Sequence, residues 1–161
     1  GYQFGAQWKP RLVVQYDYGS GDRSAKDGMN NRFDPLFGSR RFDFGSTSMF
    51  GASSRSNISS PAIRLEVQPH DTMDAYIAYR PMWLASSRDA WAVAGQRDPS
   101  GQSGSFIGQQ IDMRMRWHVL LRNLAFDIGA AVLLRGKFAT DAPGAKTGDP
   151  IYFYTQVTGR I

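Results

Sequence analysis

Hydrophobic and polar residues alternate without a break from Ile107 to His118. Ile107, Met113 and Trp117 lie on the apolar row, and Arg114 is typical of the charged row between them. Strict period-2 alternation over about twelve residues predicts a strand longer than the usual five or six. A soluble sheet would bury the apolar row in a core. A transmembrane barrel instead turns that row toward lipid and lines a wet lumen with charge.

Six further segments show the same alternation, and the predicted strands cover residues 2–8, 11–18, 63–68, 73–80, 124–135 and 151–161. The outward row of the first strand is expected to contain Tyr2, Phe4, Ala6 and Trp8. Across all seven strands, the apolar rows hold about 33 positions and no charged residue, although 20% of the chain is charged. Charge is therefore confined to one face of the predicted sheet.

The predicted connections between the strands alternate between short and long. Short turns fall near residues 9–10, 69–72 and 120–123, and long loops cover about 21–57, 86–104 and 138–149. Short turns at one end and long loops at the other are typical of outer-membrane barrels, whose turns are periplasmic and whose loops are extracellular. The sequence therefore predicts an all-β fold, an antiparallel transmembrane β-barrel segment that forms a single domain over residues 1–161.

Aromatic residues gather near both predicted ends of the strands. Trp8 and Trp117 lie at the short-turn end, and Tyr18, Tyr79 and Trp83 lie near the long-loop end. Such girdles place amphipathic rings at the two headgroup levels of a membrane, although aromatic residues are also common in strands generally. Bacterial barrels usually have an even number of strands. A count of about seven therefore predicts that this chain is the C-terminal part of a larger barrel.

Composition removes several classes of protein. The chain has no cysteine, which excludes disulfides and thiolate metal sites, and no apolar run approaches the roughly 18 residues of a membrane helix. No signal peptide is visible at the N-terminus. The net charge is +5, and 15 of the 19 basic residues are arginine, which binds carboxylates and phosphates through a planar fork. Ordinary solubility and binding of an anionic ligand both explain such a charge.

Five segments of the chain resemble the alginate-export outer-membrane porins of Gram-negative bacteria. They are residues 16–23 (YDYGSGDR), 32–38 (RFDPLFG), 55–61 (RSNISSP), 78–83 (AYRPMW) and 104–110 (GSFIGQQ). The resemblance covers nearly the whole chain and matches the C-terminal portion of the family. It implies an integral outer-membrane barrel of about eighteen strands, with an arginine-rich constriction that passes a linear polyuronate outward. It also implies an acidic polysaccharide, outer-membrane lipid, lipopolysaccharide and periplasmic secretion components as partners, and no nucleic acid.

A polyuronate carries one carboxylate per sugar, so a channel selective for it needs positive charge spaced along the lumen. The candidate pathway residues on the inward rows are Arg64, Arg80, Arg114 and Arg116 near the middle, Arg135 and Lys137 toward the extracellular rim, and Arg11, His118 and Arg160 toward the periplasmic mouth. Arg64, Arg80 and Arg114 are the strongest candidates because mid-barrel positions define a constriction. Alternatively, the supporting acids pair with these arginines in a cross-strand ladder that stiffens the wall. These acids are Glu66, Asp74, Asp112 and Asp127.

The first long loop is rich in carboxylates, and Asp22, Asp27 and Asp34 are weak candidates for binding Ca²⁺. Their spacing matches no standard calcium loop, and aspartate is an ordinary turn residue. We therefore predict no metal site. The same loop carries basic residues that could gather polymer or bind lipopolysaccharide phosphates: Arg40, Arg41 and Arg55.

No arrangement of residues suggests an enzyme. The two histidines, His70 in a predicted turn and His118 at a strand end, have no serine placed beside them as a nucleophile. We therefore predict no catalytic residues and no cofactor. The predicted function is passive export of an anionic exopolysaccharide through an arginine-lined lumen. The alternatives are a general anion-selective porin and a non-conducting β-barrel module that binds acidic glycans.

Overall fold

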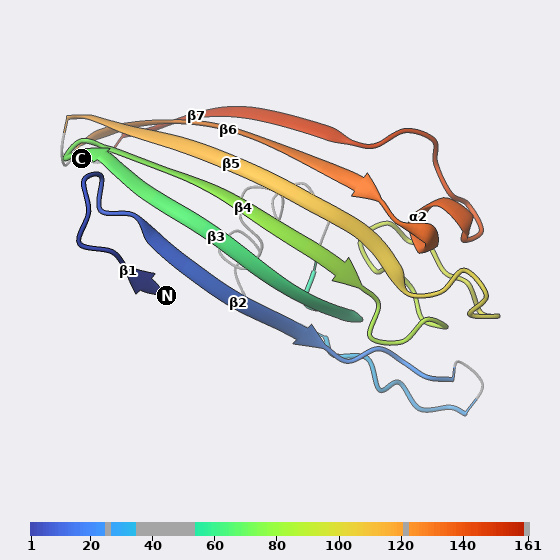
Figure 1. The fold of residues 1–161 in the computed structure, drawn as a ribbon. Helices are drawn as coiled ribbons and strands as arrows, with labels where there is room; N and C mark the ends of the chain where they lie inside the picture. Colours follow the sequence, from blue (N-terminus) through green and yellow to red (C-terminus); the bar gives the residue numbers. More distant parts are fainter. Residues whose placement is uncertain (25–26, 35–53, 121–122, 160–161) are drawn as a thin grey trace.

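The computed structural model describes residues 1–24, 27–34, 54–120 and 123–159 as a single antiparallel sheet in which each strand pairs with its neighbours in sequence (Figure 1). The strands are β1 (Tyr2–Gln3), β2 (Arg11–Gly19), β3 (Ile58–His70), β4 (Met73–Trp83), β5 (Phe106–Leu120), β6 (Leu124–Arg135) and β7 (Ile151–Gly159). A short helix, α2 (Lys137–Asp141), lies between β6 and β7. No helix in the described part of the chain is long and apolar enough to cross a membrane.

A strand lies at each of the seven predicted positions, and the predicted sorting of short and long connections is confirmed. The sixth strand has the predicted bounds, Leu124–Arg135, and β5 is longer than predicted, at 15 residues. The strand ends joined by the links from β1 to β2, β3 to β4 and β5 to β6 lie at one end of the sheet, and the strand ends joined by the three longer links lie at the other (Figure 1). We refer to these as the short-turn end and the long-loop end.

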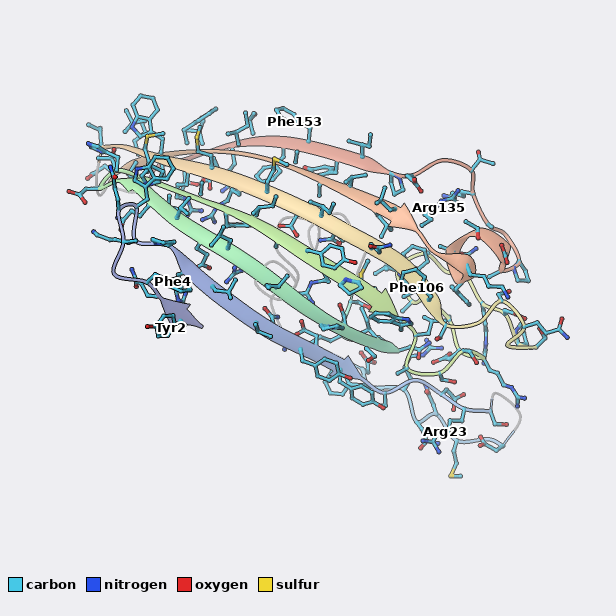
Figure 2. The ribbon with its side chains drawn as sticks, in the orientation of Figure 1. Tyr2, Phe4, Arg23, Phe106, Arg135 and Phe153 are labelled. Carbon is cyan, nitrogen blue, oxygen red and sulfur yellow. The ribbon has the colours of Figure 1, made fainter. Side chains whose placement is uncertain are left out.

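The two faces of the sheet have the reverse of the usual soluble arrangement. Large apolar side chains point outward and are exposed, as Phe153 shows on β7 (Figure 2). On the opposite face, Arg80, Asp112 and Asp127 are each 6% exposed or less. Exposed apolar residues run along every long strand, including Val14, Ile63, Ile77, Met113, Leu134 and Val157. A contiguous apolar surface of this kind belongs against lipid, as the all-β transmembrane prediction requires.

The predicted aromatic girdle residues lie near the two ends of the strands. Trp8 and Trp117 are exposed near the short turns, and Tyr18 is exposed near the long loops. Tyr79 is also exposed, and its hydroxyl donates a hydrogen bond to Gln109 Oε1 at 2.5 Å. Trp83 is half-buried because its ring packs on the ring of Phe106 from β5, with 5.3 Å between their centroids.

An apolar cluster closes the long-loop end of the inner face. Met82, Ile107 and Leu133 come from three neighbouring strands, and Phe138 of α2 packs against them with no exposed surface. The complete cluster is Ile58, Met82, Leu84, Ile107, Leu133, Phe138 and Ala142, with Trp91 packed on its side. The cluster fixes α2 and part of the loop that follows β4 onto the sheet.

The prediction that Ile107 lies on the outward row is wrong. Ile107 is 1% exposed and belongs to the inner apolar cluster. A register shift between Met82 and Trp83, opposite the start of β5, moves this part of the strand out of phase. Gly108 has a φ of +152°, and a Cβ there would lie 2.3 Å from the carbonyl oxygen of Leu134. Glycine therefore permits the irregularity that turns Ile107 inward.

The first strand is shorter than predicted. The prediction extends it to Trp8, but β1 ends at Gln3 and the chain then turns. Trp8 and Lys9 both have a positive φ, and the N–H of Phe4 donates to the carbonyl oxygen of Pro10 at 2.8 Å. A turn that uses two left-handed residues ends the alternation, so only the start of the predicted outward row belongs to a strand. The helix α2 in the third long loop is also absent from the prediction.

Placing a charge on the outward face tests its contact with lipid. Met113→Arg, at the centre of β5, is expected to lower the free energy of unfolding of the membrane-inserted barrel by about 2–4 kcal/mol, whereas Leu120→Arg at the strand end costs about 0–1 kcal/mol. The measurement is denaturant unfolding in lipid bilayers. Equal and small losses for both variants would show that this face contacts water.

Candidate functional site

The inner face of the sheet carries charged and aromatic side chains in rows that cross the strands. Arg114 of β5 lies directly opposite Tyr76 of β4 and Gly129 of β6, and Arg116 lies opposite Asp74 and Asp127. Because side chains on one face recur every second residue, these rows stack along the strands. The inner face of β3 to β6 is therefore the candidate site.

Two arginines of β5 share one buried carboxylate. The Nε of Arg116 donates to Asp127 at 2.8 Å, and the Nε of Arg114 lies 3.8 Å from the same oxygen. Arg114 also donates to Asp74 at 2.5 Å, and His118 Nε2 lies 3.6 Å from the other oxygen of Asp74. Each guanidinium is thus held in one place by carboxylates on neighbouring strands.

Tyr76 lies between two guanidinium groups from the strands on either side of it. The Cζ of Arg114 is 5.0 Å from its ring centroid, and the Cζ of Arg64 is 5.5 Å away, both within cation–π range. Glu66 forms ion pairs with Arg64 at 2.8 Å and with Arg11 at 2.9 Å. The ring and Glu66 therefore orient the arginines of the middle rows.

The charges are layered by depth. The side chains of Arg64, Arg114 and Arg116 are 35%, 24% and 33% exposed, whereas Asp127 is 3% exposed. Asp112 is likewise 3% exposed. Over the inner face of β2 to β6, six arginines face five carboxylates, but most of the carboxylates lie beneath the arginines. The accessible middle of this face therefore presents more guanidinium than carboxylate, although Glu66 and Asp74 remain partly accessible as well.

Arg80 is arranged differently from the other middle arginines. Its side chain is 7% exposed, and its guanidinium donates to Asp17 on β2 at 2.6 Å. Asp17 also accepts from the amide of Gln15 at 2.8 Å, and Arg55 lies 4.0 Å from its other oxygen. Ser60 adds a longer contact of 3.4 Å to Arg80. This buried pair braces β4 against β2 across the intervening strand.

Strand β6 carries small residues on the inner face, flanked by tyrosines of β7. A Cβ on Gly129 would lie 2.3–2.6 Å from the ring and hydroxyl atoms of Tyr154, so the ring covers this glycine. Tyr152 stacks with Tyr154 at 5.9 Å between centroids. Across the inner face, β5 thus carries arginines, β6 carries the small residues Gly129 and Ala131, and β7 carries aromatic rings.

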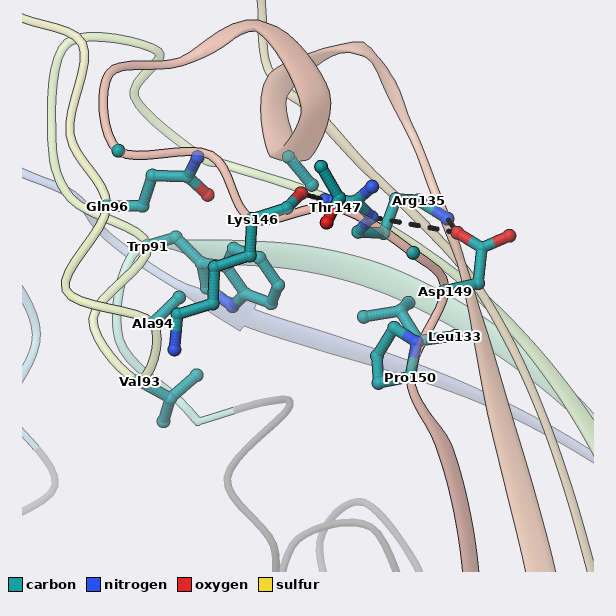
Figure 3. Close-up of a pocket in the computed structure, with 13 residues that line it drawn as sticks. Trp91, Val93, Ala94, Gln96, Leu133, Arg135, Lys146, Thr147, Asp149 and Pro150 are labelled. Atoms are coloured by element: carbon teal, nitrogen blue, oxygen red, sulfur yellow. Dashed lines mark hydrogen bonds and ion pairs between the residues drawn. The ribbon is translucent and has the colours of Figure 1, made fainter.

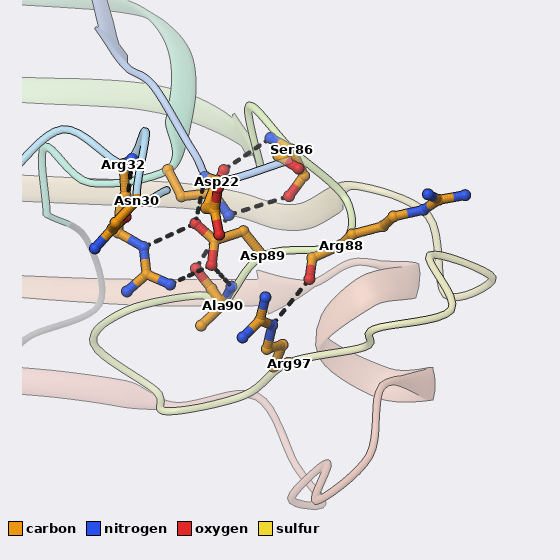
Figure 4. Close-up of polar contacts among 9 residues, drawn as sticks. Asp22, Asn30, Arg32, Ser86, Arg88, Asp89, Ala90 and Arg97 are labelled. Carbon is orange, nitrogen blue, oxygen red and sulfur yellow. Dashed lines mark hydrogen bonds and ion pairs between the residues drawn. The ribbon is translucent and has the colours of Figure 1, made fainter. Parts of the chain in front are cut away.

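A polar network joins the first and second long loops (Figure 4). Asp89 is fully buried and accepts from the Nε of Arg32 at 2.7 Å and from the backbone N–H of Asp22 at 2.8 Å. Burial raises the pKa of Asp89, but the hydrogen bonds from Arg32 and from the backbone outweigh it and hold this pKa below its usual value. Asn57 donates to the carbonyls of Ser86 and Ala90, both at 3.1 Å. Both loops therefore have a fixed position at their base.

Comparison with known protein families shows which family this sheet belongs to. The family described as "Alginate export" matches residues 1–153. The chain belongs to the alginate export family. No curated protein and no solved structure matches the chain. Alginate export proteins are outer-membrane β-barrel channels for polysaccharide transport and are not enzymes, so the sheet is a segment of such a barrel.

Other predicted pathway residues of this alginate export protein lie near the ends of the sheet. The Nε of Arg135 is 3.7 Å from Asp149, and its guanidinium also contacts the carbonyl oxygen of Lys146. Lys137 is exposed at the start of α2, and Arg11 lies near the short turns. Three predicted basic residues lie outside the described residues: Arg40, Arg41 and Arg160.

The weak calcium candidates are not brought together. Asp22 is buried beside Asp89, whereas Asp27 and Asp34 are exposed. Within residues 1–24, 27–34, 54–120 and 123–159, no group of three or more acidic or histidine side chains is placed to hold a metal ion. Asp27 instead accepts a hydrogen bond from the N–H of Met29 at 3.0 Å, as a turn aspartate does.

Sequence reasoning missed Asp89, Asn57 and Trp91, which organise the long loops. No periodicity marks them, because each acts through contacts between loops that are far apart in the chain. The stretch 55–61 carries one of the segments that resemble the family, and Asn57, its third residue, has a φ of +50° and 1% exposure. A buried asparagine in left-handed conformation is the signal that marks this position in the structure.

Replacing Asp89 tests the loop network. Because the pKa of Asp89 is lowered on folding, its contribution is fully present above the ordinary aspartate value of about 4 and is lost as pH falls through the lower folded value. Asp89→Asn should speed hydrogen exchange of residues 84–97 at pH 7 by roughly tenfold or more, because a charged hydrogen-bonded group is lost. In wild type, the protection factors of residues 84–97 should fall when the pH drops through the folded pKa of Asp89, and Asp89→Asn should abolish this fall.

Asp34→Asn serves as the matched control, since Asp34 is an exposed aspartate in the first long loop, which the network joins to the loop of Asp89. We expect exchange at residues 84–97 to stay unchanged in this variant. Equal effects of the two substitutions would show that Asp89 does not organise these loops.

Proposed function

We propose that the inner face of this sheet lines part of an outer-membrane lumen through which an anionic, alginate-like polyuronate diffuses passively outward. One observation carries the proposal, namely that Arg64, Arg114 and Arg116 stand accessible above buried Asp112 and Asp127. A guanidinium fork that reaches solvent can bind a sugar carboxylate. The acid beneath it holds the arginine in place without occupying the lumen.

The pairing of the arginines also favours release of the polymer. Conduction requires sites that bind strongly enough to admit the substrate and weakly enough to let it leave. Arg114 already forms ion pairs with Asp74 and Asp127, and Arg64 already forms one with Glu66. The attraction of these two arginines for a further carboxylate is therefore reduced. Several such sites in adjacent rows would let a linear polyanion move by exchanging one partner for the next.

The remaining predicted residues take supporting roles in this proposal. Arg80 and Asp17 stiffen the wall, because their ion pair is almost completely buried. Arg135 holds the third long loop through Asp149, and Arg11 and Lys137 lie near the two mouths. The short turns would face the periplasm and the long loops the exterior, with lipid and lipopolysaccharide around the apolar face.

The seven strands would be one segment of a barrel of about eighteen strands. β7 pairs only with β6, and β1 covers only Arg11 and Leu12 of β2, so both sides of the described sheet expose backbone groups. Lipid cannot satisfy such groups, and in the proposed larger barrel other strands would pair with them. Seven strands closed on themselves would leave a lumen filled by side chains, and we expect no conduction from this segment alone.

Single-channel recording of the complete barrel in a planar bilayer tests the function. An anion-selective reversal potential under a salt gradient is expected, together with block by micromolar to millimolar polyuronate. Arg64→Gln and Arg114→Gln should each weaken block roughly two- to fivefold, because a partly exposed charge pair contributes about 0.5–1 kcal/mol. Asp74→Asn removes a negative charge from the same face, so it should increase anion selectivity and strengthen block by polyuronate.

Arg11→Gln is the matched control, since it removes the same charge near the short-turn mouth, and a smaller effect is expected. Cation selectivity of the wild-type barrel, or indifference to polyuronate, would contradict export. Anion selectivity without any preference for polyuronate over chloride or phosphate would instead identify a general anion-selective porin.

A further inference from the structure

A pocket of about 400 Å³ lies where the inner row of β6 meets the long loops (Figure 3). The geometry points to a binding site for an acidic sugar residue of the exported chain, at the long-loop mouth of the lumen. This inference rests on the proposed export function and names a site beyond the arginine rows. A pocket of this size lies within the range of small-molecule sites and can hold one or two sugar rings.

Three parts of the chain build the pocket. Leu133 and Arg135 are the last two inner-row residues of β6, and they form its floor with Pro150. The second long loop supplies Trp91 and its neighbours, and the third long loop supplies Gly144 and residues 146–149. In Figure 3, Trp91 and Lys146 lie on one side of the pocket, and Leu133, Arg135 and Pro150 lie on the other.

Trp91 offers a fixed aromatic surface. Its ring packs against the apolar cluster of the long-loop end and is half-buried, so one part is anchored and another part faces the pocket. Its backbone N–H donates to the carbonyl oxygen of Gln96 at 2.8 Å, and the Gln96 amide donates to Ala142 at 3.2 Å. A large ring held in this way can pack against the C–H face of a pyranose with little ordering cost.

Lys146 supplies the charge available to a ligand. Its side chain is exposed, and within the described residues no carboxylate lies within ion-pair distance of its ammonium group. Arg135 is already engaged by Asp149 and by the carbonyl oxygen of Lys146, so it shapes the pocket instead. A lysine on a flexible stem is a point charge that can follow a carboxylate without fixing its orientation.

The pocket continues the proposed path. Asp127, Gly129, Ala131, Leu133 and Arg135 recur at every second position of β6 and therefore share the inner face. The ring of Tyr154 covers Gly129 and the cluster around Phe138 covers Leu133, so a polymer would pass over these side chains and not against the strand itself. A polymer that follows β6 toward the long loops would reach Trp91 and Lys146 last, which makes this pocket an exit site.

Side-specific block of the complete barrel tests the inference. A uronate oligomer of defined length is added to the long-loop side or to the short-turn side of a planar bilayer. Lys146→Gln and Trp91→Leu should each shorten block from the long-loop side roughly three- to tenfold, because one charge contact or one aromatic contact is lost. Open-channel conductance, reversal potential and block from the short-turn side should not change.

Arg88→Gln is the matched control, because it removes an exposed cation from the second long loop outside the pocket. Lys146→Arg should retain the block, and a loss equal to that of Lys146→Gln would overturn the role of the charge. A carboxyl-reduced oligomer should not distinguish wild type from the Lys146 variants. Relief of block by inorganic phosphate as effective as relief by monomeric uronate would overturn the acidic-sugar assignment in favour of a phosphate ligand.

The outcomes separate this inference from the function on which it rests. Long-loop block unchanged by Lys146→Gln, with block still weakened by Arg114→Gln, would refute the exit site and leave export standing. A wild-type barrel that ignores the oligomer from both sides would refute export itself.

Discussion

The structure depends on one constraint, which is that a chain in lipid must satisfy its backbone N–H and C=O groups internally. An antiparallel ladder does this, and its period of two then assigns each residue to lipid or to lumen. The outward residues Met113 and Ile77 can be apolar and exposed because nothing polar is needed there. Every charged residue of the described strands lies on the opposite, inner face, where Arg116 and Asp127 pair with each other.

The strands could be predicted from the sequence because their alternation is long and unbroken, as the agreement over Leu124–Arg135 shows. Ile107 was misplaced because a register shift in one strand depends on its neighbour, which no single-strand pattern contains. The first strand was overextended because the left-handed turn at Trp8 leaves no mark in hydrophobicity. The apolar cluster around Phe138 was missed because loop residues complete it.

The alternation in the sequence predicts which face of the sheet the arginines lie on, but it does not predict how exposed each arginine is. Sequence reasoning left two roles open, a cation track and a ladder of ion pairs, and treated them as alternatives. The structure contains both, since Asp127 is buried while Arg114 and Arg116, which it anchors, remain accessible. Arg80, on the same face by phase, is enclosed with Asp17 instead. Which arginine reaches the lumen depends on cross-strand neighbours, and that information lies in the register.

The buried ion pair of Arg80 and Asp17 joins two strands that are not neighbours, since β3 lies between β2 and β4. Backbone hydrogen bonds fix the spacing of adjacent strands but leave the sheet free to bend about each of them. A side-chain contact that spans three strands limits this bending, because flattening the sheet would pull the guanidinium away from the carboxylate. The local curvature of the sheet, and with it the width of the lumen at this depth, therefore depends in part on a single ion pair.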